Sequence, residues 1–121
     1  MNNVDWTIYH LKRFRKTKAS KDLENALKNY NKILASSLSF KKLLAISQYV
    51  AEAFKVLNPK DSEKLDQQIG NIINCLETKN IGKADDALIE LSRASMEFIK
   101  EHEQILGFEV KYPYTVSYTH L

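Results

Sequence analysis

The sequence predicts an all-α protein: an antiparallel four-helix bundle over about residues 21–106, with an additional amphipathic basic helix at its N-terminus and an extended C-terminal tail. Apolar residues recur every three or four positions in successive segments, which is the period of a helix with one buried face. The 121 residues include only three glycines and two prolines, too few for the frequent turns of an all-β fold. A chain of this length buries one core, so residues 1–107 are expected to form a single domain.

The additional N-terminal helix is expected over about residues 4–16 and is both aromatic and basic. Aliphatic residues share one of its sides, and Trp6, His10 and Phe14 follow at four-residue steps on the adjoining side. The sequence leaves open whether this helix continues into the next one or breaks at residues 17–20. It ends in a cluster of four cations: Lys12, Arg13, Arg15 and Lys16.

The next predicted helix has an apolar stripe that runs from Leu23 to Leu34. Its first turn is acidic, as the helix dipole favours. A serine-rich junction follows, and Ser39 is the expected N-cap of the third helix. This third helix, over residues 43–57, has so few polar positions that we expect other helices to cover it on more than one side, at the centre of the bundle.

Asn58 and Pro59 mark the clearest break in the chain, because proline disfavours helical geometry in the residue before it. Asp61 or Ser62 is expected to cap the helix that follows. Within that helix, Gly70 either weakens the structure or allows a close approach by a neighbouring helix. The predicted buried face of this helix carries five aliphatic residues: Leu65, Ile69, Ile72, Ile73 and Leu76.

The last predicted helix runs from about residue 84 to residue 106, and Gly107 stands where a left-handed C-cap would end it. Short connections predict that successive helices are antiparallel neighbours. Residues 108–121 are predicted to be extended, since Pro113 rules out a continuing helix. Residues 116–121 match a translation of the transposon end used in sequencing-library adaptors, so they are expected to be non-native, with the true C-terminus missing.

Charge is unevenly distributed along the chain, which carries +3 overall. Residues 1–42 hold ten Lys and Arg against three Asp and Glu, whereas residues 43–121 hold eight against twelve. Two interpretations fit this split. Opposite charges attract neighbouring helices within the fold, or the basic part binds an acidic partner.

Residue patterns typical of catalysis, metal binding or nucleotide binding are missing from the sequence. No Glu is followed by His three residues later, as di-metal sites in helical bundles require, and His102 has no converging ligands. Cys75 lacks a histidine partner and is expected to be a small core residue. The scattered glycines cannot form a phosphate-binding loop. We therefore expect a protein that is not an enzyme and holds neither a metal nor a cofactor.

The single cysteine, Cys75, excludes an internal disulfide and fits a reducing compartment. The first ten residues contain no uninterrupted apolar run, and no segment is long and apolar enough to span a bilayer. The sequence therefore predicts a cytoplasmic protein that is not an integral membrane protein.

The leading functional hypothesis is a small protein-binding helical bundle that works as an adaptor, a chaperone-like protein or a regulatory subunit. A second surface for such a partner is an exposed acidic stripe at Glu90, Glu97 and Glu101. The alternative is a nucleic-acid-associated protein whose N-terminal cations neutralise phosphates, or contact another anionic surface weakly. Whether the N-terminal helix packs on the bundle or is free to bind is left open. The candidate partner-binding residues are Trp6, Lys12, Arg13, Phe14, Arg15 and Lys16.

Overall fold

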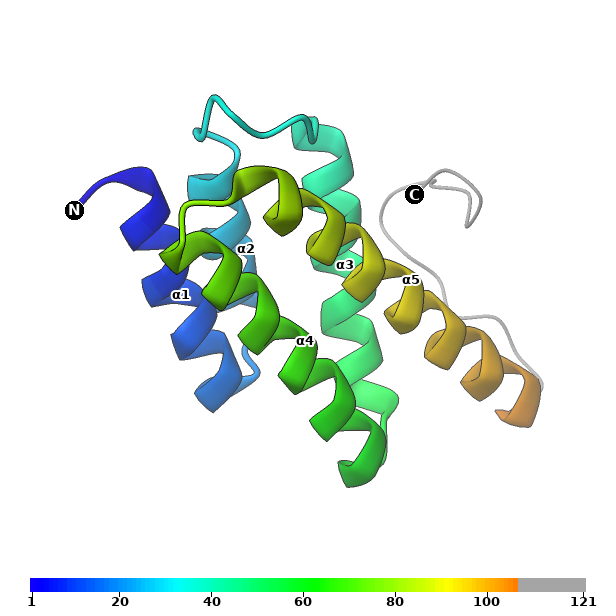
Figure 1. Ribbon diagram of the computed structural model, residues 1–121. Coiled ribbons are helices and arrows are strands. Elements are labelled where there is room, and N and C mark those ends of the chain that lie inside the picture. The colour runs from blue at the N-terminus through cyan, green and yellow to red at the C-terminus, as the bar shows by residue number, and fades with distance from the viewer. Residues whose placement is uncertain (107–121) are drawn as a thin grey trace.

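Five helices make up the part of the chain that the computed structural model describes, residues 1–106 (Figure 1). No strand occurs within this range, so the predicted all-α class and helical bundle are confirmed. The predicted C-cap at Gly107 and the predicted tail at 108–121, with its adaptor-derived end at 116–121, lie outside the described residues. The helices are α1 (Asn3–Thr17), α2 (Ser20–Tyr30), α3 (Phe40–Val56), α4 (Pro59–Glu77) and α5 (Ile81–Leu106).

The helices close into a ring of contacts. α1 packs on α2 and on α4, α2 packs on α3, and α5 packs on both α3 and α4. α1 is therefore a full member of the bundle, which answers the question that the sequence left open. Figure 1 shows α5 inclined across α3. Because α5 lies against both α3 and α4, these two consecutive helices share little contact, and the prediction that all successive helices are neighbours is wrong for this pair.

The break between α1 and α2 falls at Lys18, whose backbone is left-handed with a φ of 55°. The Lys18 amide donates to the carbonyl oxygen of Phe14 over 2.8 Å, and its ammonium donates to the carbonyl oxygen of Arg15 over 2.7 Å. These bonds satisfy carbonyl groups that the end of a helix leaves without partners. α2 then begins at Ser20 and runs back along α1 (Figure 1).

Side-chain caps start α3 and α4. The hydroxyl oxygen of Ser39 accepts from the Lys42 amide over 3.2 Å, which confirms the predicted cap of α3. α4 is capped by Asn58, whose side-chain oxygen accepts from the Asp61 amide over 2.9 Å. The expectation that Asp61 or Ser62 would be the cap is wrong, because Pro59 fits the first helical position, where no amide donor is needed.

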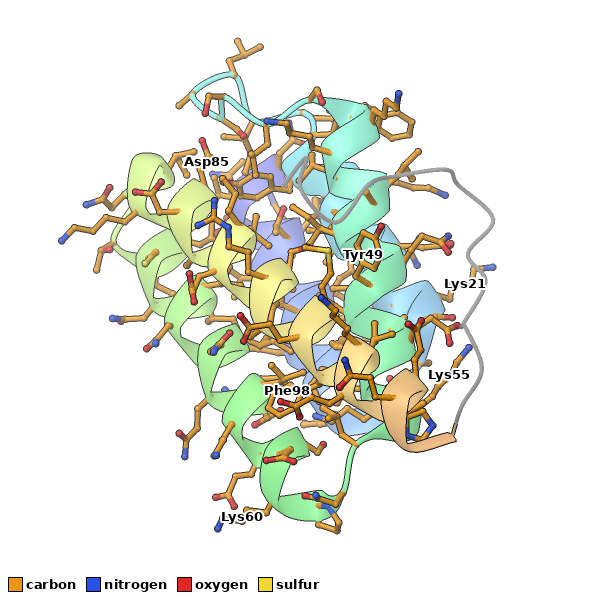
Figure 2. All side chains as sticks on the ribbon, turned by 90° about the vertical axis from the view of Figure 1, so that its right-hand side faces the viewer. Lys21, Tyr49, Lys55, Lys60, Asp85 and Phe98 are labelled. Carbon is orange, nitrogen blue, oxygen red and sulfur yellow. The ribbon has the colours of Figure 1, made fainter. Side chains whose placement is uncertain are left out.

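A buried aspartate of α5 holds the connection between α2 and α3. Asp85 is only 5% exposed. Ser36 donates to its carboxylate from the hydroxyl over 2.7 Å, and Ser37 donates from its amide over 2.8 Å and from its hydroxyl over 3.1 Å. The hydroxyl of Tyr30 donates to the same carboxylate. Residues 31–39, which we call the Asp85 loop, are thereby fixed over the start of α5, at the upper end of Figure 2.

The Asp85 loop also explains where α2 ends. The apolar stripe was predicted to reach Leu34, but α2 ends at Tyr30; Ile33 still packs against the core, whereas Leu34 is fully exposed. The four hydrogen bonds to Asp85 come from donors at and after the end of the helix, so they draw the chain out of the helical path. Burial by itself raises the pKa of Asp85, but the bonds from Ser37, Tyr30 and Ser36 outweigh burial and hold that pKa below its ordinary value.

The hydrophobic core receives side chains from all five helices. The five aliphatic residues predicted to form the buried face of α4 are all buried. Tyr49 of α3, labelled in Figure 2, is 2% exposed, which fits the prediction that α3 is covered on more than one side. Within residues 1–106, no helix has the length and apolarity needed to cross a bilayer.

Candidate functional site

The candidate site residues of α1 separate into an inward and an outward set. Phe14 is fully buried, and its ring meets the ring of Phe54 edge-on with centroids 5.4 Å apart. Together with Leu11 it anchors α1 in the core. Phe14 therefore belongs to the folded interior, and a partner at the surface of α1 would not touch it.

Three aromatic rings form a cluster on α1, two of them exposed and the third, His10, half-buried. Trp6 and Tyr9 are 40% and 42% exposed. Their ring centroids lie 5.8 Å apart, and the His10 ring lies 6.0 Å from Trp6 and 5.1 Å from Tyr9. We call Trp6, Tyr9 and His10 the aromatic cluster. Sequence reasoning did not single out Tyr9 as a site residue, although the spacing of three and four residues from Trp6 was a signal that the three rings share one face.

Arg13 extends the aromatic cluster by one helical turn. Its guanidinium donates to the Tyr9 hydroxyl over 3.4 Å and lies 3.3 Å from the carboxylate of Asp22 on α2. The Thr17 hydroxyl donates to the same carboxylate over 2.6 Å, and this bond, with the nearby Arg13 charge, holds the pKa of Asp22 below its ordinary value. The Arg13 side chain is 54% exposed, so its guanidinium is oriented by these contacts and still reaches solvent.

Arg15 has a structural role instead. Its guanidinium donates twice to Asp66 of α4, over 3.2 and 2.8 Å, and the Lys18 ammonium donates to the same carboxylate over 2.7 Å. Burial raises the pKa of Asp66, but the hydrogen bonds from Arg15 and Lys18 outweigh it and hold that pKa below its ordinary value. This ion cluster fastens the C-terminal end of α1 to α4.

Gly70 of α4 makes room for that cluster. A Cβ atom at position 70 would lie 3.1 Å from a terminal nitrogen of the Arg15 guanidinium. Of the two roles predicted for Gly70, the structure thus supports the close approach, although the approaching group is a side chain and not a helix backbone.

Lys12 and Lys16 are exposed cations without an internal partner. Neither makes an ion pair or a hydrogen bond with any residue that the structure describes. By the helical spacing both lie next to Tyr9, on the side of it away from His10, so they border the aromatic cluster along one edge. We call this combined surface the outer face of α1; it consists of Trp6, Tyr9, His10, Lys12, Arg13 and Lys16.

Other candidate features contribute less. Glu90, Glu97 and Glu101 are exposed on α5, as the predicted acidic stripe requires. Cys75 is half-buried against the core, in accord with its predicted packing role. No group of three or more His, Cys, Asp or Glu side chains is gathered as a metal site needs within residues 1–106.

An open hollow of about 620 Å³ lies between the start of α1 and the turn from α4 to α5. Aliphatic side chains, among them Val4, Ile8 and Leu76, make up much of its lining, and Asp5, Glu77 and Lys79 stand among them. A catalytic pocket normally presents several polar groups that converge on one point, whereas this hollow is lined largely by aliphatic side chains. The outer face of α1 is therefore the more distinctive candidate site.

Comparison of the chain with models of protein families, with curated proteins and with solved structures finds no match. A functional argument therefore rests on the chemistry of the surface itself.

Proposed function

We propose that this protein is a small cytoplasmic helical bundle without enzymatic activity that binds another protein through the outer face of α1. Its role would be that of an adaptor, a chaperone-like protein or a regulatory subunit. The observation that carries the proposal is the aromatic cluster: Trp6 and Tyr9 keep about two fifths of their surface in solvent, whereas Phe14 of the same helix is fully buried.

The composition of the outer face supports a protein partner. Trp, Tyr and Arg are the residues most enriched among those that dominate binding energy in protein interfaces. Here Trp6, Tyr9 and Arg13 are neighbours on one helix, joined by ring contacts and by the bond from Arg13 to the Tyr9 hydroxyl. Because these contacts restrict the side chains before binding, less conformational entropy is lost when a partner covers them.

The charges of the outer face indicate the kind of partner. Lys12 and Lys16 lie beside Tyr9 at one edge of the aromatic cluster and are not neutralised within the described part of the chain. A complementary surface would therefore carry carboxylates around an apolar depression that receives Trp6. Association should become slower as salt is added, because exposed charges steer the encounter.

Affinity capture followed by titration tests the proposal. The immobilised full chain is exposed to a nuclease-treated lysate of cells that express it, and the captured protein is purified for measurement of its Kd. Trp6→Ala and the pair Lys12→Glu with Lys16→Glu should each weaken binding by about tenfold or more. The pair Lys60→Glu with Lys100→Glu, an equal double charge reversal at exposed positions of α4 and α5, serves as the control; Lys60 is labelled in Figure 2.

Equal affinity for the wild type and the Trp6→Ala protein would contradict the proposal. Charge reversals at Arg13 and Arg15 are less informative, because these residues pair with Asp22 and Asp66 and their loss also disturbs the fold.

Nucleic-acid binding is the second candidate, since the same outer face offers flat rings beside unpaired lysines. Bases stack on exposed aromatic rings while cations neutralise the backbone, and such binding weakens steeply with salt. A gel-shift experiment with single-stranded RNA at low ionic strength separates the two candidates. Absence of retention there would exclude the nucleic-acid function.

A further inference from the structure

We propose that the Asp85 loop and the first turn of α3 form an anchor for the surface of an anionic lipid bilayer. Leu34 and Phe40 would enter the interfacial region, and Lys32, Lys41 and Lys42 would lie against the phosphates. This surface is separate from the outer face of α1, and the inference does not depend on the function proposed for that face.

Leu34 is the most exposed large apolar side chain of the described residues. It is fully exposed, and Phe40, the first residue of α3, is 46% exposed. Single exposed apolar residues are common on protein surfaces. Residues 31–39 form the loop at the upper end of the bundle in Figure 1, and a fully exposed leucine in this loop is available to a flat surface at that end.

The Asp85 loop is held in place while Leu34 stays outside. The donors on both sides of the tip, at Tyr30 and at Ser36 and Ser37, bond to the buried carboxylate of Asp85. The next residue is anchored as well, since Leu38 is buried. The loop therefore presents Leu34 without an ordering cost at the time of binding, which raises the affinity of a shallow contact.

The segment of chain that carries the loop has charges of one sign. Residues 25–51 include four lysines and no aspartate or glutamate. All four, Lys28, Lys32, Lys41 and Lys42, are exposed, and none pairs with a residue in the described range. The carboxylate that touches the loop, Asp85, is buried and occupied by loop donors.

The position of Lys41 and Lys42 is unfavourable for the helix itself. They lie in the first turn of α3, which has no acidic residue, although the positive end of the helix dipole favours acidic side chains there. Cations at that place add to the positive potential of the helix end. An anionic surface would offset this repulsion, whereas folding alone does not explain it.

A lipid surface fits these features better than a protein groove or a nucleic acid. One leucine and one phenylalanine bury too little area for a stable protein interface, which needs a larger contact. Stacking on bases requires flat rings, and only Phe40 supplies one. Lysines that attract anionic lipids, together with a few apolar side chains that enter the bilayer interface, give reversible membrane binding. Neither the charge nor the apolar contact is sufficient alone.

Vesicle sedimentation with the full chain tests the anchor. Vesicles of phosphatidylcholine alone are compared with vesicles in which about a third of the lipid is phosphatidylserine. The chain should bind the anionic vesicles only, and salt should release it. Leu34→Ser should weaken binding by about tenfold, and the pair Lys41→Gln with Lys42→Gln by about 25-fold.

The matched control removes the same charge at the opposite end of the bundle, with Lys55→Gln and Lys60→Gln (Figure 2). This control and Trp6→Ala should both leave vesicle binding unchanged. All substituted side chains except Trp6 lie outside the aromatic cluster, so a failure of the anchor and a failure of the proposed function are distinguishable. Equal thermal unfolding of wild type and variants, followed by circular dichroism, establishes that they fold.

Insertion itself is measured with Leu34→Trp in a Trp6→Phe background, so that one indole reports from the loop. Its fluorescence should shift to the blue when anionic vesicles are added. An unshifted spectrum, or anionic binding that Leu34→Ser leaves intact, would overturn the proposal. Retention of single-stranded RNA or of a captured protein that is lost in Leu34→Ser, without vesicle binding, would also overturn it and assign the loop to that other partner.

Discussion

Two aspartates fasten the basic N-terminal part of the chain to its acidic remainder, and they do so in different ways. Asp85 is 5% exposed and accepts hydrogen bonds from neutral donors of the Asp85 loop. Asp66 keeps 26% of its side chain in solvent and accepts from the cations Arg15 and Lys18. The first fixes the connection of α2 to α3, and the second fixes the end of α1 on α4.

The difference between the two aspartates shows which contacts stabilise the fold and which residues remain available for binding. A buried carboxylate whose donors are all neutral resists salt, and its removal leaves buried groups unpaired. An ion cluster that solvent reaches is weaker and screened. Within residues 1–42, only Arg13, Arg15 and Lys18 form ion pairs with carboxylates of described residues. Most lysines of this part therefore do not stabilise the fold through an ion pair and are available for binding.

Removal of the buried carboxylate should have the largest effect. We expect Asp85→Ala to lower the free energy of unfolding by about 3 kcal/mol, because the Tyr30 hydroxyl and the Ser37 amide lose a charged acceptor. The measurement is urea denaturation followed by circular dichroism. Asp86→Ala, at the exposed neighbouring position, is the control and should change the free energy by less than about 0.5 kcal/mol. Equal losses for the two variants would refute the role given to Asp85.

The second-largest effect should be a loss of stability in acid, caused by protonation of the Asp85 carboxylate. The folded pKa of Asp85 is lowered, so its contribution to stability is complete above the ordinary carboxyl pKa of about 4 and is lost as the pH falls through the lower folded value. Unfolding free energies measured across this range should therefore decrease toward low pH. Asp85→Asn should flatten that decrease more than Asp66→Asn does. A steeper decrease in Asp85→Asn than in the wild type would contradict the assigned direction.

The solvent-exposed ion cluster should matter less. Asp66→Asn is expected to lower the free energy of unfolding by about 1 kcal/mol, since both partners of Asp66 are about a third exposed and the pairs are screened. Salt titration supplies the comparison with Asp85. The cost of Asp66→Asn should shrink in high salt, while the cost of Asp85→Ala should hardly change. The opposite salt dependence would reverse our assignment of the two roles.

Substitution of Gly70 should change the free energy of unfolding least. In a helix interior alanine is better than glycine by about 1 kcal/mol, but here the new methyl group must displace the Arg15 guanidinium. We therefore expect Gly70→Ala to be nearly neutral in the wild type and stabilising by about 0.5 kcal/mol or more in an Arg15→Ala background. Chemical denaturation of the four proteins in this cycle measures the difference. Equal effects in both backgrounds would show that the close approach has no energetic weight.

The sequence predicted features that depend on local spacing. The buried face of α4 and the Ser39 cap follow from patterns within a few residues, and both are present. The Asp85 and Asp66 clusters were missed because each joins residues about fifty positions apart, which no local pattern records. The predicted second helix was too long for the same reason. Leu34 continues the helical period, but hydrogen bonds to the distant carboxylate of Asp85 turn the chain away from the helix before that position.

The candidate site was predicted in part for a related reason. The helical spacing predicted that Trp6 and Phe14 share one side of the helix. Each four-residue step exceeds a full turn of 3.6 residues, however, so two such steps rotate Phe14 into the core while Trp6 stays in solvent. Likewise, the cationic cluster was treated as one surface. Packing on α4 removes Arg15 from it and leaves Lys12 and Lys16 outside.

The most direct test of the account is the affinity of the Trp6→Ala protein for its captured protein partner, measured by isothermal titration at a temperature where both proteins are folded. If the outer face of α1 exists for binding, the Kd should rise by about tenfold or more while the unfolding free energy stays within about 1 kcal/mol of the wild type. An unchanged Kd, with a folded state destabilised by several times that amount, would show that Trp6 serves the fold and not a partner.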